Sequence, residues 1–502
     1  MTDRSRLEEG LAAVERRLTG GEAGADLLAE RAGLLAELGR TDEAKAQYLA
    51  ILAVDPGHFT TLNNFGVLLH QARFRTAAKT LFSQAIARRP NQPLGYVNLA
   101  NLLMYEDELE AAKAHLETAL GLDPAHAGAH QRLSGVLHDL GDWDGMQRHR
   151  RLGFSPTPVQ VRPYFGVSPP VRVLVLTSLP AADLNWPDLI DTDRCAVTTI
   201  AAAFLGPSEP LPPHDLIFNA IGDADIAQPD LLAAKAIVGG SGAPVVNDPD
   251  RVLRTGRLAV AERLADLPGV RSPKAASLRR SDLVHGGFQT IEGAGIGFPL
   301  LLRSPGFHMG RHFARVARPE DLAAAARQLP GGDLMAFQQL DTRNADGLHR
   351  KYRVMLIDGR LYPLHLAASK DWKVHYATSA MEADAELRAE EDRFLANMAT
   401  VLGEVAMKAL AAIAGRLDLD YAGVDFGLGP AGELLLFEAN AVMTIAPPGE
   451  DPKWDYRRPA IEAASAAARE MLVRRGLGYR DTDARKARPS GPVELSTRRP
   501  VN

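Results

Sequence analysis

Apolar and small residues recur with a fixed period along the first third of the chain. Pro56, Pro90 and Pro124 lie 34 residues apart. The same period relates a small position and a bulky position upstream of each proline: Ala44, Ala78, Ala112, Tyr48, Phe82 and Leu116. Several positions that repeat in phase predict stacked helix pairs, because one pair cannot bury its apolar face alone.

This period resembles the tetratricopeptide repeat, a helix–turn–helix unit. Three full repeats cover about residues 25–126, residues 127–152 form a degenerate fourth pair, and residues 5–19 form an N-terminal helix. Phe65-Gly66 is a large-small pair that lets two helices approach closely. The resemblance implies an all-α solenoid over residues 1–153 that recruits a peptide or protein partner.

Asparagine and tyrosine side chains gather on the first helices of these pairs. Asparagine lowers helix propensity, so its clustering predicts amide contacts with the backbone of an extended peptide. The alternative is a solvated helix face. The candidates are Asn63, Asn64, Tyr96, Asn98 and Asn101.

Proline occurs five times within residues 154–170, which predicts a semi-rigid linker. Apolar, β-branched runs then alternate with helical patterns, which predicts a parallel α/β sheet over residues 171–250. The strands are expected at Val171–Thr177, Ala196–Ala203 and Leu216–Ile221, and the helices at Pro229–Ile237 and Asp250–Leu267.

Composition narrows the class of protein. The chain has 502 residues, of which 46% are hydrophobic and 24% charged, as in folded proteins of about three domains. A net charge of −5 argues against a dedicated nucleic-acid binder. The one cysteine, Cys195, rules out an intramolecular disulfide and a cysteine zinc cluster. With no secretory signal and no run of about 20 apolar residues, we expect a cytoplasmic protein without a membrane partner.

Common catalytic motifs are missing from the sequence, including the phosphate loop GxxxxGK[ST], HExxH and GxSxG. The glycine-rich stretch at residues 293–297 precedes a strand, so we interpret it as a flexible connection. His308 and His312 have the spacing of metal ligands on a helix, but Gly310 between them predicts a loop.

Two apolar runs flank a glycine-rich turn within residues 421–440, which predicts a β-hairpin. Its centre lies midway between Asp425 and Glu438, so these two carboxylates should be cross-strand neighbours. Asn440 is two residues from Glu438 and should share its face.

Facing carboxylates destabilise a sheet unless a basic neighbour or a bound cation offsets the charge. Two carboxylates and an amide oxygen form a set that suits Mg²⁺, or Mn²⁺ in its place. Asp425, Glu438 and Asn440 are therefore the predicted metal ligands. An exposed hairpin with incidental acids is the alternative.

Asp…Glu-x-Asn at the end of an α/β chain resembles the metal-binding signature of the ATP-grasp superfamily, and residues 423–425 are most similar to the glutathione synthetase and ribosomal-protein glutamate ligase branch. The resemblance spans about residues 171–475. Further segments resemble other elements of the family, in the order in which the family has them. Residues 248–267 resemble the opening helix, residues 298–303 the strand with a phosphate-binding cation, and residues 304–313 the loop over the phosphates. Residues 334–340 resemble the adenine hinge, and residues 351–359 resemble the strand with the catalytic arginine.

The resemblance implies roles for individual residues. Arg353 and Arg303 would be catalytic, and Arg257 and Arg303 stand where the family usually has lysine. ATP would be bound by Arg257, Arg303, Gly306, His308, Gly310, Gln338, Gln339 and Leu340. The carboxylate and amine substrates would be held by Lys351, Lys370, Trp372 and Lys373.

The expected architecture is thus a tetratricopeptide-repeat solenoid, an α/β pre-ATP-grasp domain over 171–250, an α+β ATP-grasp domain over 251–475 and a disordered basic tail over 476–502. The expected function is an ATP-dependent carboxylate–amine ligase that forms a C–N bond through an acylphosphate. The alternatives are a non-catalytic scaffold that senses nucleotide, and a small-molecule ligase or kinase whose repeats serve oligomerisation.

Overall fold

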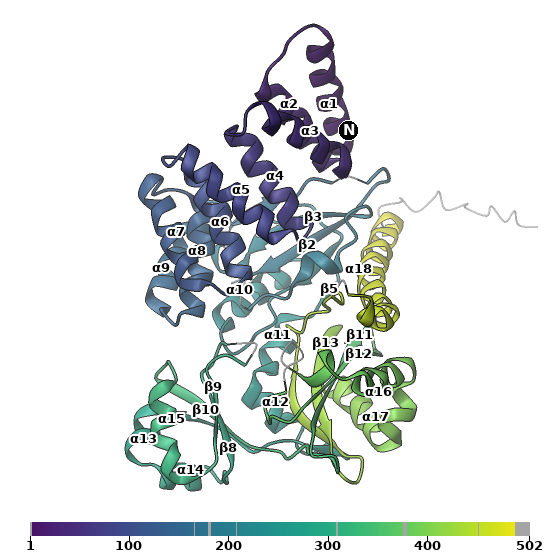
Figure 1. Ribbon diagram of the computed structural model, residues 1–502. Coiled ribbons are helices and arrows are strands. Elements are labelled where there is room, and N and C mark those ends of the chain that lie inside the picture. The colour runs from purple at the N-terminus through teal and green to yellow at the C-terminus, as the bar shows by residue number, and fades with distance from the viewer. Residues whose placement is uncertain are drawn as a thin grey trace, which may run out of the picture.

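This computed structural model describes residues 3–164, 166–178, 182–206, 208–307, 310–374, 379–449 and 451–486. An N-terminal array of helices is followed by three sheets (Figure 1). We call the sheet of β1–β5 the first, the sheet of β7–β10 the second, and the sheet of β6 and β11–β14 the third.

The array consists of paired antiparallel helices, as the period predicts. Its bounds are α1 Asp3–Thr19, α2 Ala25–Glu37, α3 Thr41–Val54, α4 Phe59–Gln71, α5 Arg75–Arg88, α6 Pro93–Tyr105, α7 Leu109–Leu122, α8 Ala127–Asp139 and α9 Trp143–Phe154. The periodic small and bulky residues form its core, where Ala78 and Phe82 are 0% and 1% exposed. Gly66 is needed for close approach, since a Cβ there would lie 2.5 Å from the Phe82 ring.

The first sheet has the order β1-β3-β2-β4-β5, parallel except for β1. Its elements are β1 Val159–Val161, β2 Val171–Thr177, η1 Trp186–Leu189, β3 Cys195–Ala201, η2 Ala202–Phe204, β4 Leu216–Asn219, α10 Gln228–Gly239 and β5 Val245–Val246. Strand β1 corrects the predicted linker: it lies within residues 154–170 and pairs with β3. Proline density ended the helix there without preventing an edge strand.

The second sheet is antiparallel, in the order β7-β10-β8-β9. The chain reaches it through α11 Pro249–Val252, η3 Leu253–Thr255, α12 Arg257–Arg263 and β6 Val270–Arg271. The helix predicted over 250–267 is therefore interrupted, at Gly256. The sheet and its helices comprise β7 Ala275–Arg279, α13 Arg280–His285, α14 Phe288–Gly293, β8 Leu300–Arg303, β9 Phe313–Val316, η4 Pro319–Asp321, α15 Leu322–Gln328 and β10 Asp333–Gln338.

The third sheet has the order β12-β11-β13-β14-β6. Its elements are β11 His349–Ile357, β12 Arg360–Ser369, η6 Ala380–Glu382, α16 Ala385–Ala396, α17 Met398–Leu417, β13 Tyr421–Leu428, β14 Leu434–Asn440, η7 Pro452–Arg457 and α18 Arg458–Lys486. Alternate residues of β11 face opposite sides: Val354 and Leu356 pack with α17, while Met355 and Ile357 pack with α18 and the first sheet. Helix α18 runs on to Lys486, so residues 476–486 are helical where we expected a disordered tail.

Helix α17 meets the length and composition of a membrane-spanning helix, contrary to our expectation that no such run exists. Within this structure it covers the third sheet and buries Leu402, Leu410, Ile413 and Leu417. One face of the helix thus packs on the sheet, and 28% of its apolar stretch is buried.

The array and the first sheet share one hydrophobic core. Leu133, Leu137 and Met146 of the array belong to the same cluster as Leu176 and Ile217 of the first sheet. A buried ion pair between Arg150 of α9 and Asp230 of α10 joins them, and the Phe154 and Phe204 rings stack with centroids 6.2 Å apart. The repeats are thus fixed against the α/β region (Figure 1).

Candidate functional site

A row of polar residues crosses four neighbouring strands of the third sheet. Asp425 of β13 is the register partner of both Arg353 on β11 and Glu438 on β14. Arg353 is in turn the partner of His365 on β12. The predicted pairing of Asp425 with Glu438 is therefore present, and the predicted catalytic arginine lies beside it.

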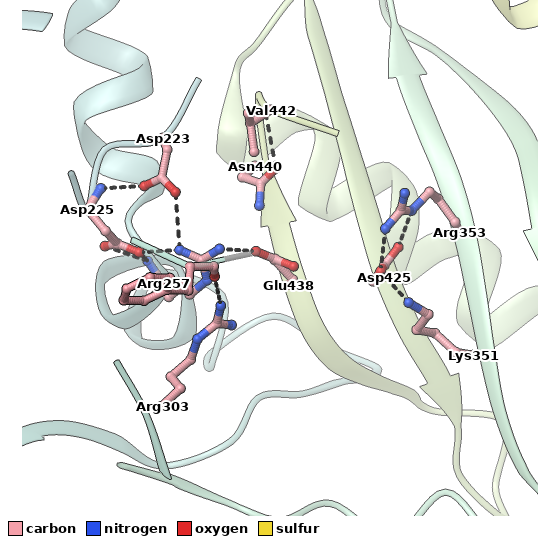
Figure 2. Close-up of polar contacts among 11 residues, drawn as sticks. Asp223, Asp225, Arg257, Arg303, Lys351, Arg353, Asp425, Glu438, Asn440 and Val442 are labelled. Atoms are coloured by element: carbon pink, nitrogen blue, oxygen red, sulfur yellow. Dashed lines mark hydrogen bonds and ion pairs between the residues drawn. The ribbon is translucent and has the colours of Figure 1, made fainter. Parts of the chain in front are cut away.

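Asp425 is held by two cations. Arg353 donates to both carboxylate oxygens, with Nε–Oδ1 and Nη2–Oδ2 distances of 2.6 and 2.7 Å, and Lys351 Nζ lies 3.1 Å from Oδ2 (Figure 2). Burial alone would raise the pKa of Asp425, but Arg353 and Lys351 overcome this effect and hold the pKa far below its usual range. The basic neighbour that facing carboxylates require is thus present at Asp425.

Glu438 points away from Asp425 to a second cationic group. Its Oε1 lies 2.9 Å from Nη2 of Arg257, whose Nη1 is 2.8 Å from Asp225 and 3.4 Å from Asp223 (Figure 2). Arg257 is only 9% exposed. Burial would lower the pKa of Arg257, yet the surrounding carboxylates raise it above its usual value, so its charge is already balanced by acids.

Asp223 and Asp225 belong to the loop after β4, so the first sheet contributes directly to this site. The loop approaches the end of β14 closely: a Cβ on Gly222 would lie 2.8 Å from the backbone of Ala441 and Val442. Close packing without a side chain is the reason for glycine at this position. The contact sets the distance between the two acids and Glu438.

A second connection between these sheets runs through Asn247. Its side chain donates to Tyr421 O at 2.8 Å and accepts from Tyr421 N at 2.9 Å, at the start of β13. The Asn247 backbone is left-handed, with φ of 58°. An asparagine tolerates this conformation better than most residues. Its two hydrogen bonds to Tyr421 fix β13 against the first sheet.

The predicted metal ligands offer only oxygen donors, which fits Mg²⁺ or Mn²⁺. Each donor has a partner of its own: Asp425 and Glu438 pair with cations, and Asn440 Oδ1 accepts from Val442 N at 3.1 Å. Across the described ranges there is no group of three or more His, Cys, Asp and Glu side chains placed to hold a metal. A metal ion bound here would compete with Arg257 and Arg353 for the oxygens of Glu438 and Asp425.

Arg303 differs from the other cations of the site. Within the part of the chain that the structure covers, it forms no ion pair, and its Nε has no hydrogen-bond partner. Its Nη2 donates to the carbonyl of Phe307, and its guanidinium lies 5.4 Å from the centroid of the Phe313 ring. Burial and the neighbouring charge of Arg257 lower the pKa of Arg303 to about 10. Glu438, Asp225 and Asp223 raise this pKa only in part, so the charge of Arg303 is less well balanced than that of Arg257.

The loop between β8 and β9 begins at Arg303. Gly306 and Gly310 both have positive φ, 82° and 71°, which favours glycine. Phe307 is 1% exposed, so this part of the loop is anchored. His308 lies outside the described residues, and His312 contacts the Phe307 ring.

The predicted adenine hinge lies at the end of β10. The backbone N–H of Gln338 donates to Lys274 O at 2.8 Å, and the backbone N–H of Gln339 donates to Pro299 O at 3.2 Å. Leu340 is the next residue. A small, largely apolar cleft opens beside β10. It is lined by Arg257, Val260, Ala261, Pro273, Phe337, Leu436, Phe437, Glu438 and Ala439.

The predicted substrate residues divide into two groups. Lys351 is bound to Asp425, as described above. Trp372 and Lys373 contact the β8–β9 loop instead: the rings of Trp372 and Phe313 are 5.2 Å apart, and Lys373 Nζ donates to Gly310 O at 2.5 Å. Lys370 is exposed.

Most of the predicted peptide-binding residues form hydrogen bonds within the array. Asn98 donates to Asn63 Oδ1 at 3.0 Å, and Asn63 donates to Phe59 O. Tyr96 donates to Pro90 O, and Asn101 accepts from Arg132 at 3.4 Å. Asn64 is exposed. Asn63 is buried, so its amide stabilises the helices and is not presented to solvent.

Sequence analysis missed Asp223 and Asp225. One signal was available: two acids directly after an apolar strand, at the carboxyl end of a parallel sheet, where ligands usually bind. Their contact with Arg257 depends on how distant segments pack together, so no local sequence pattern predicts it.

Comparisons with known proteins address the array. A family model for the tetratricopeptide repeat matches residues 95–126. Residues 95–126 contain most of α6 and all of α7, so this helix pair is similar to a tetratricopeptide repeat. Repeats of this kind serve as scaffolds for protein–protein interaction, so a protein partner is expected for this part of the chain.

Several solved structures were also matched over part of this chain, with low TM-scores. MamA from Desulfovibrio magneticus is 22% identical, covering 28% of this chain and 81% of its own, with a TM-score of 0.26. The pilF protein of Pseudomonas aeruginosa is 19% identical over 30% of this chain and 68% of its own, with a TM-score of 0.28. A thermophilic tetratricopeptide-repeat protein of Thermus thermophilus is 17% identical over 31% and 84%, with a TM-score of 0.28. A search of curated proteins finds no match.

Proposed function

We propose that this chain is an ATP-grasp ligase that joins a carboxylate to an amine through an acylphosphate, while its repeats recruit a peptide or protein. One observation carries the proposal: the half-buried Arg303 forms no ion pair within the described residues, and it lies near a group of acids and a small cleft beside β10. A polyphosphate with an adenine attached is the kind of ligand that would satisfy all three features. The proposed location is the cytoplasm.

Two steps make up the proposed reaction. A substrate carboxylate oxygen attacks the γ-phosphorus of ATP, and the bond to ADP breaks. The amine nitrogen then attacks the acyl carbon, phosphate leaves, and the amine loses a proton to solvent. Phosphoryl transfer depends on positioning and charge neutralisation, which Arg303 and Arg257 would supply to the phosphates.

Arg353 would stabilise the oxyanion of the tetrahedral intermediate. It is already oriented by two hydrogen bonds to Asp425, and a fixed donor costs no reorganisation during the reaction. Lys351 lies at the same carboxylate. Lys370, Trp372 and Lys373 would line the acceptor side, close to the β8–β9 loop.

Asp425, Glu438 and Asn440 would hold Mg²⁺. When bound, the ion would neutralise negative charge on the phosphates. Arg257, released from Glu438, would then be free to turn toward the phosphates, while Asp425 would keep Arg353 in place. The ion pair of Arg257 with Glu438 would in this way hold a cation ready for the substrate.

A second candidate is a scaffold that senses nucleotide without turning it over. It is favoured by the balance of charge at Arg257, whose three carboxylate neighbours compete with phosphate. This candidate predicts binding of Mg-ATP with no release of ADP.

The test measures binding first and turnover second. Calorimetry of the full chain with a non-hydrolysable Mg-ATP analogue should show one site. Phosphate release is then assayed against a panel of carboxylates and amines, including acidic peptides, with Glu438→Gln as the inactive control. Binding without turnover on the panel supports the scaffold, and the absence of binding would refute both candidates.

A further inference from the structure

The β8–β9 loop is held from outside by the repeat array. Gly306 lies against α9, since a Cβ there would be 3.2 Å from the Trp143 ring and 3.5 Å from His138 Nε2. It would also be 2.4 Å from Ile226, in the segment after β4. The loop thus sits in a narrow space between the last repeat and the first sheet.

Phe307 is the anchor of this contact. Its ring centroid lies 5.6 Å from His138 and 5.8 Å from Trp143, with the Trp143 ring edge-on. The same residue accepts a hydrogen bond from Arg303 through its carbonyl. Packing against the array therefore positions the carbonyl to which Arg303 donates.

A charged contact holds the far side of the loop. Nη2 of Arg311 lies 3.1 Å from Asp139 at the end of α8, and its Nη1 lies 3.6 Å from Asp107, after α6. Asp139 also contacts His138 Nδ1 at 3.1 Å. Residues on both sides of the loop's centre are thus bound to the third and fourth repeats.

We propose that the last repeats position the β8–β9 loop and thereby set the affinity of the site for a nucleoside triphosphate. Trp143 and Asp139 are positioning residues, acting through Phe307 and Arg311. The proposal rests on the proposed function, because it takes the anion at Arg303 to be phosphate. It makes the array part of the nucleotide site in addition to a docking module.

Thermodynamic linkage gives this arrangement a second consequence. If the array sets nucleotide affinity, nucleotide must change the array's affinity for its partner by the same factor. A partner bound beside Asp139 or Asp107 would therefore bind with a different affinity when nucleotide is present than when it is absent.

The test uses the full chain. Asp139→Asn removes the charge that faces Arg311, and Trp143→Ala removes the ring that faces Phe307. Asp144→Asn is the matched control, because Asp144 is exposed at the start of the same helix as Trp143. Binding of a non-hydrolysable Mg-ATP analogue is measured by calorimetry, and hydrogen exchange is measured on peptides that contain Arg303 to Phe313.

We expect Asp139→Asn to weaken analogue binding about fivefold, and Trp143→Ala more. Exchange of the loop peptides should quicken in both variants and stay unchanged in Asp144→Asn. The exchanged pair Asp139→Arg with Arg311→Asp should recover most of the affinity, which a general loss of stability would not allow. Thermal melting of each variant checks that it is folded.

The outcomes separate the two proposals. If the unaltered chain does not bind the analogue, the proposed function is refuted. If the unaltered chain binds and the two variants bind equally well, or their loop exchange is unchanged, the positioning role is refuted while the proposed function stands.

Discussion

Arg353 and Asp425 are register partners on adjacent strands and are joined by two parallel hydrogen bonds of 2.6 and 2.7 Å. Asp425 is 3% exposed, so the pair lies in a medium where a lone charge is costly. The geometry makes the two residues depend on each other.

Asp425→Asn should therefore lower the free energy of unfolding by about 3–5 kcal/mol, because Arg353 and Lys351 lose their buried counter-ion. Analogue binding with Mg²⁺ should be lost as well. Chemical denaturation measures the first effect and calorimetry the second. Asp341→Asn is the control, since Asp341 pairs with Arg343 at the surface and should change stability by at most about 1 kcal/mol. Equal effects in the two variants would contradict this account.

Arg303→Met should separate stability from binding. Removing a half-buried cation without a carboxylate partner should leave stability unchanged or raise it by about 1 kcal/mol. Binding of the Mg-ATP analogue should fall at least about tenfold, because the anion loses its guanidinium. Arg318→Met, just after strand β9, replaces an exposed arginine that pairs with Asp321 at the surface and should alter neither by much. A destabilised Arg303→Met variant that still binds would overturn the assignment of Arg303 as the anion-binding group.

The His130–His149 contact should make the array sensitive to acid. His130 Nε2 donates to Pro124 O at 3.0 Å, which leaves its Nδ1 to accept from His149 Nδ1 at 2.8 Å. Burial and the neighbouring His130 lower the pKa of His149 from its usual 6.5. The unfolded chain then binds more protons below that value, so stability is complete above about pH 6.5 and decreases as the pH falls.

Melting temperature measured between about pH 5 and 7.5 checks this expectation. His149→Gln should flatten the dependence, because the titrating group is gone. A variant with the same slope as the unaltered chain would show that other groups control the acid sensitivity.

The thiol of Cys195 should be inert in the folded chain. Burial raises its pKa to about 12, so almost no thiolate exists at neutral pH. A thiol reagent should react only after denaturation. Cys195→Ser should leave nucleotide binding unchanged, and a loss of binding would point to a role for the thiol.

Two glycines of the array test its packing. Gly66→Ala should destabilise the array by about 1–3 kcal/mol, because the new Cβ would be 2.5 Å from the Phe82 ring. Gly33→Ala is the matched substitution within α2, where only Tyr48 Oη lies nearby, at 3.9 Å. It should stabilise by about 0.5–1 kcal/mol, the usual gain from alanine in a helix. Thermal melts of both variants should shift in opposite directions.

Sequence predicted the features that depend on local regularity. The period of 34 placed the helix pairs, since Ala78 and Phe82 recur in phase with their equivalents. The symmetry of one turn gave the pairing of Asp425 with Glu438, because register in a hairpin follows from the turn.

The features that sequence did not predict depend on distant parts of the chain. Asp223 and Asp225 meet Arg257 only because the first sheet packs on the end of β14. Gly306 and Phe307 resembled a flexible loop, and their anchoring to Trp143 required the array to be placed in space. Prolines around strand β1 predicted a linker, and basic residues at the end of α18 predicted a disordered tail. In the structure, pairing with β3 and continuation of the helix outweigh these local preferences.

The hydrophobic core shared by the array and the first sheet has a consequence for how this chain can be divided. Leu133 and Met146 belong to one cluster with Leu176 and Ile217, so removal of residues 1–153 would uncover apolar surface on the sheet. A truncated protein would tend to aggregate, and its lost activity would say nothing about recruitment. The repeats therefore cannot simply be exchanged for those of another protein. A different array would need apolar residues that fit the first sheet at this interface before the combined chain could fold.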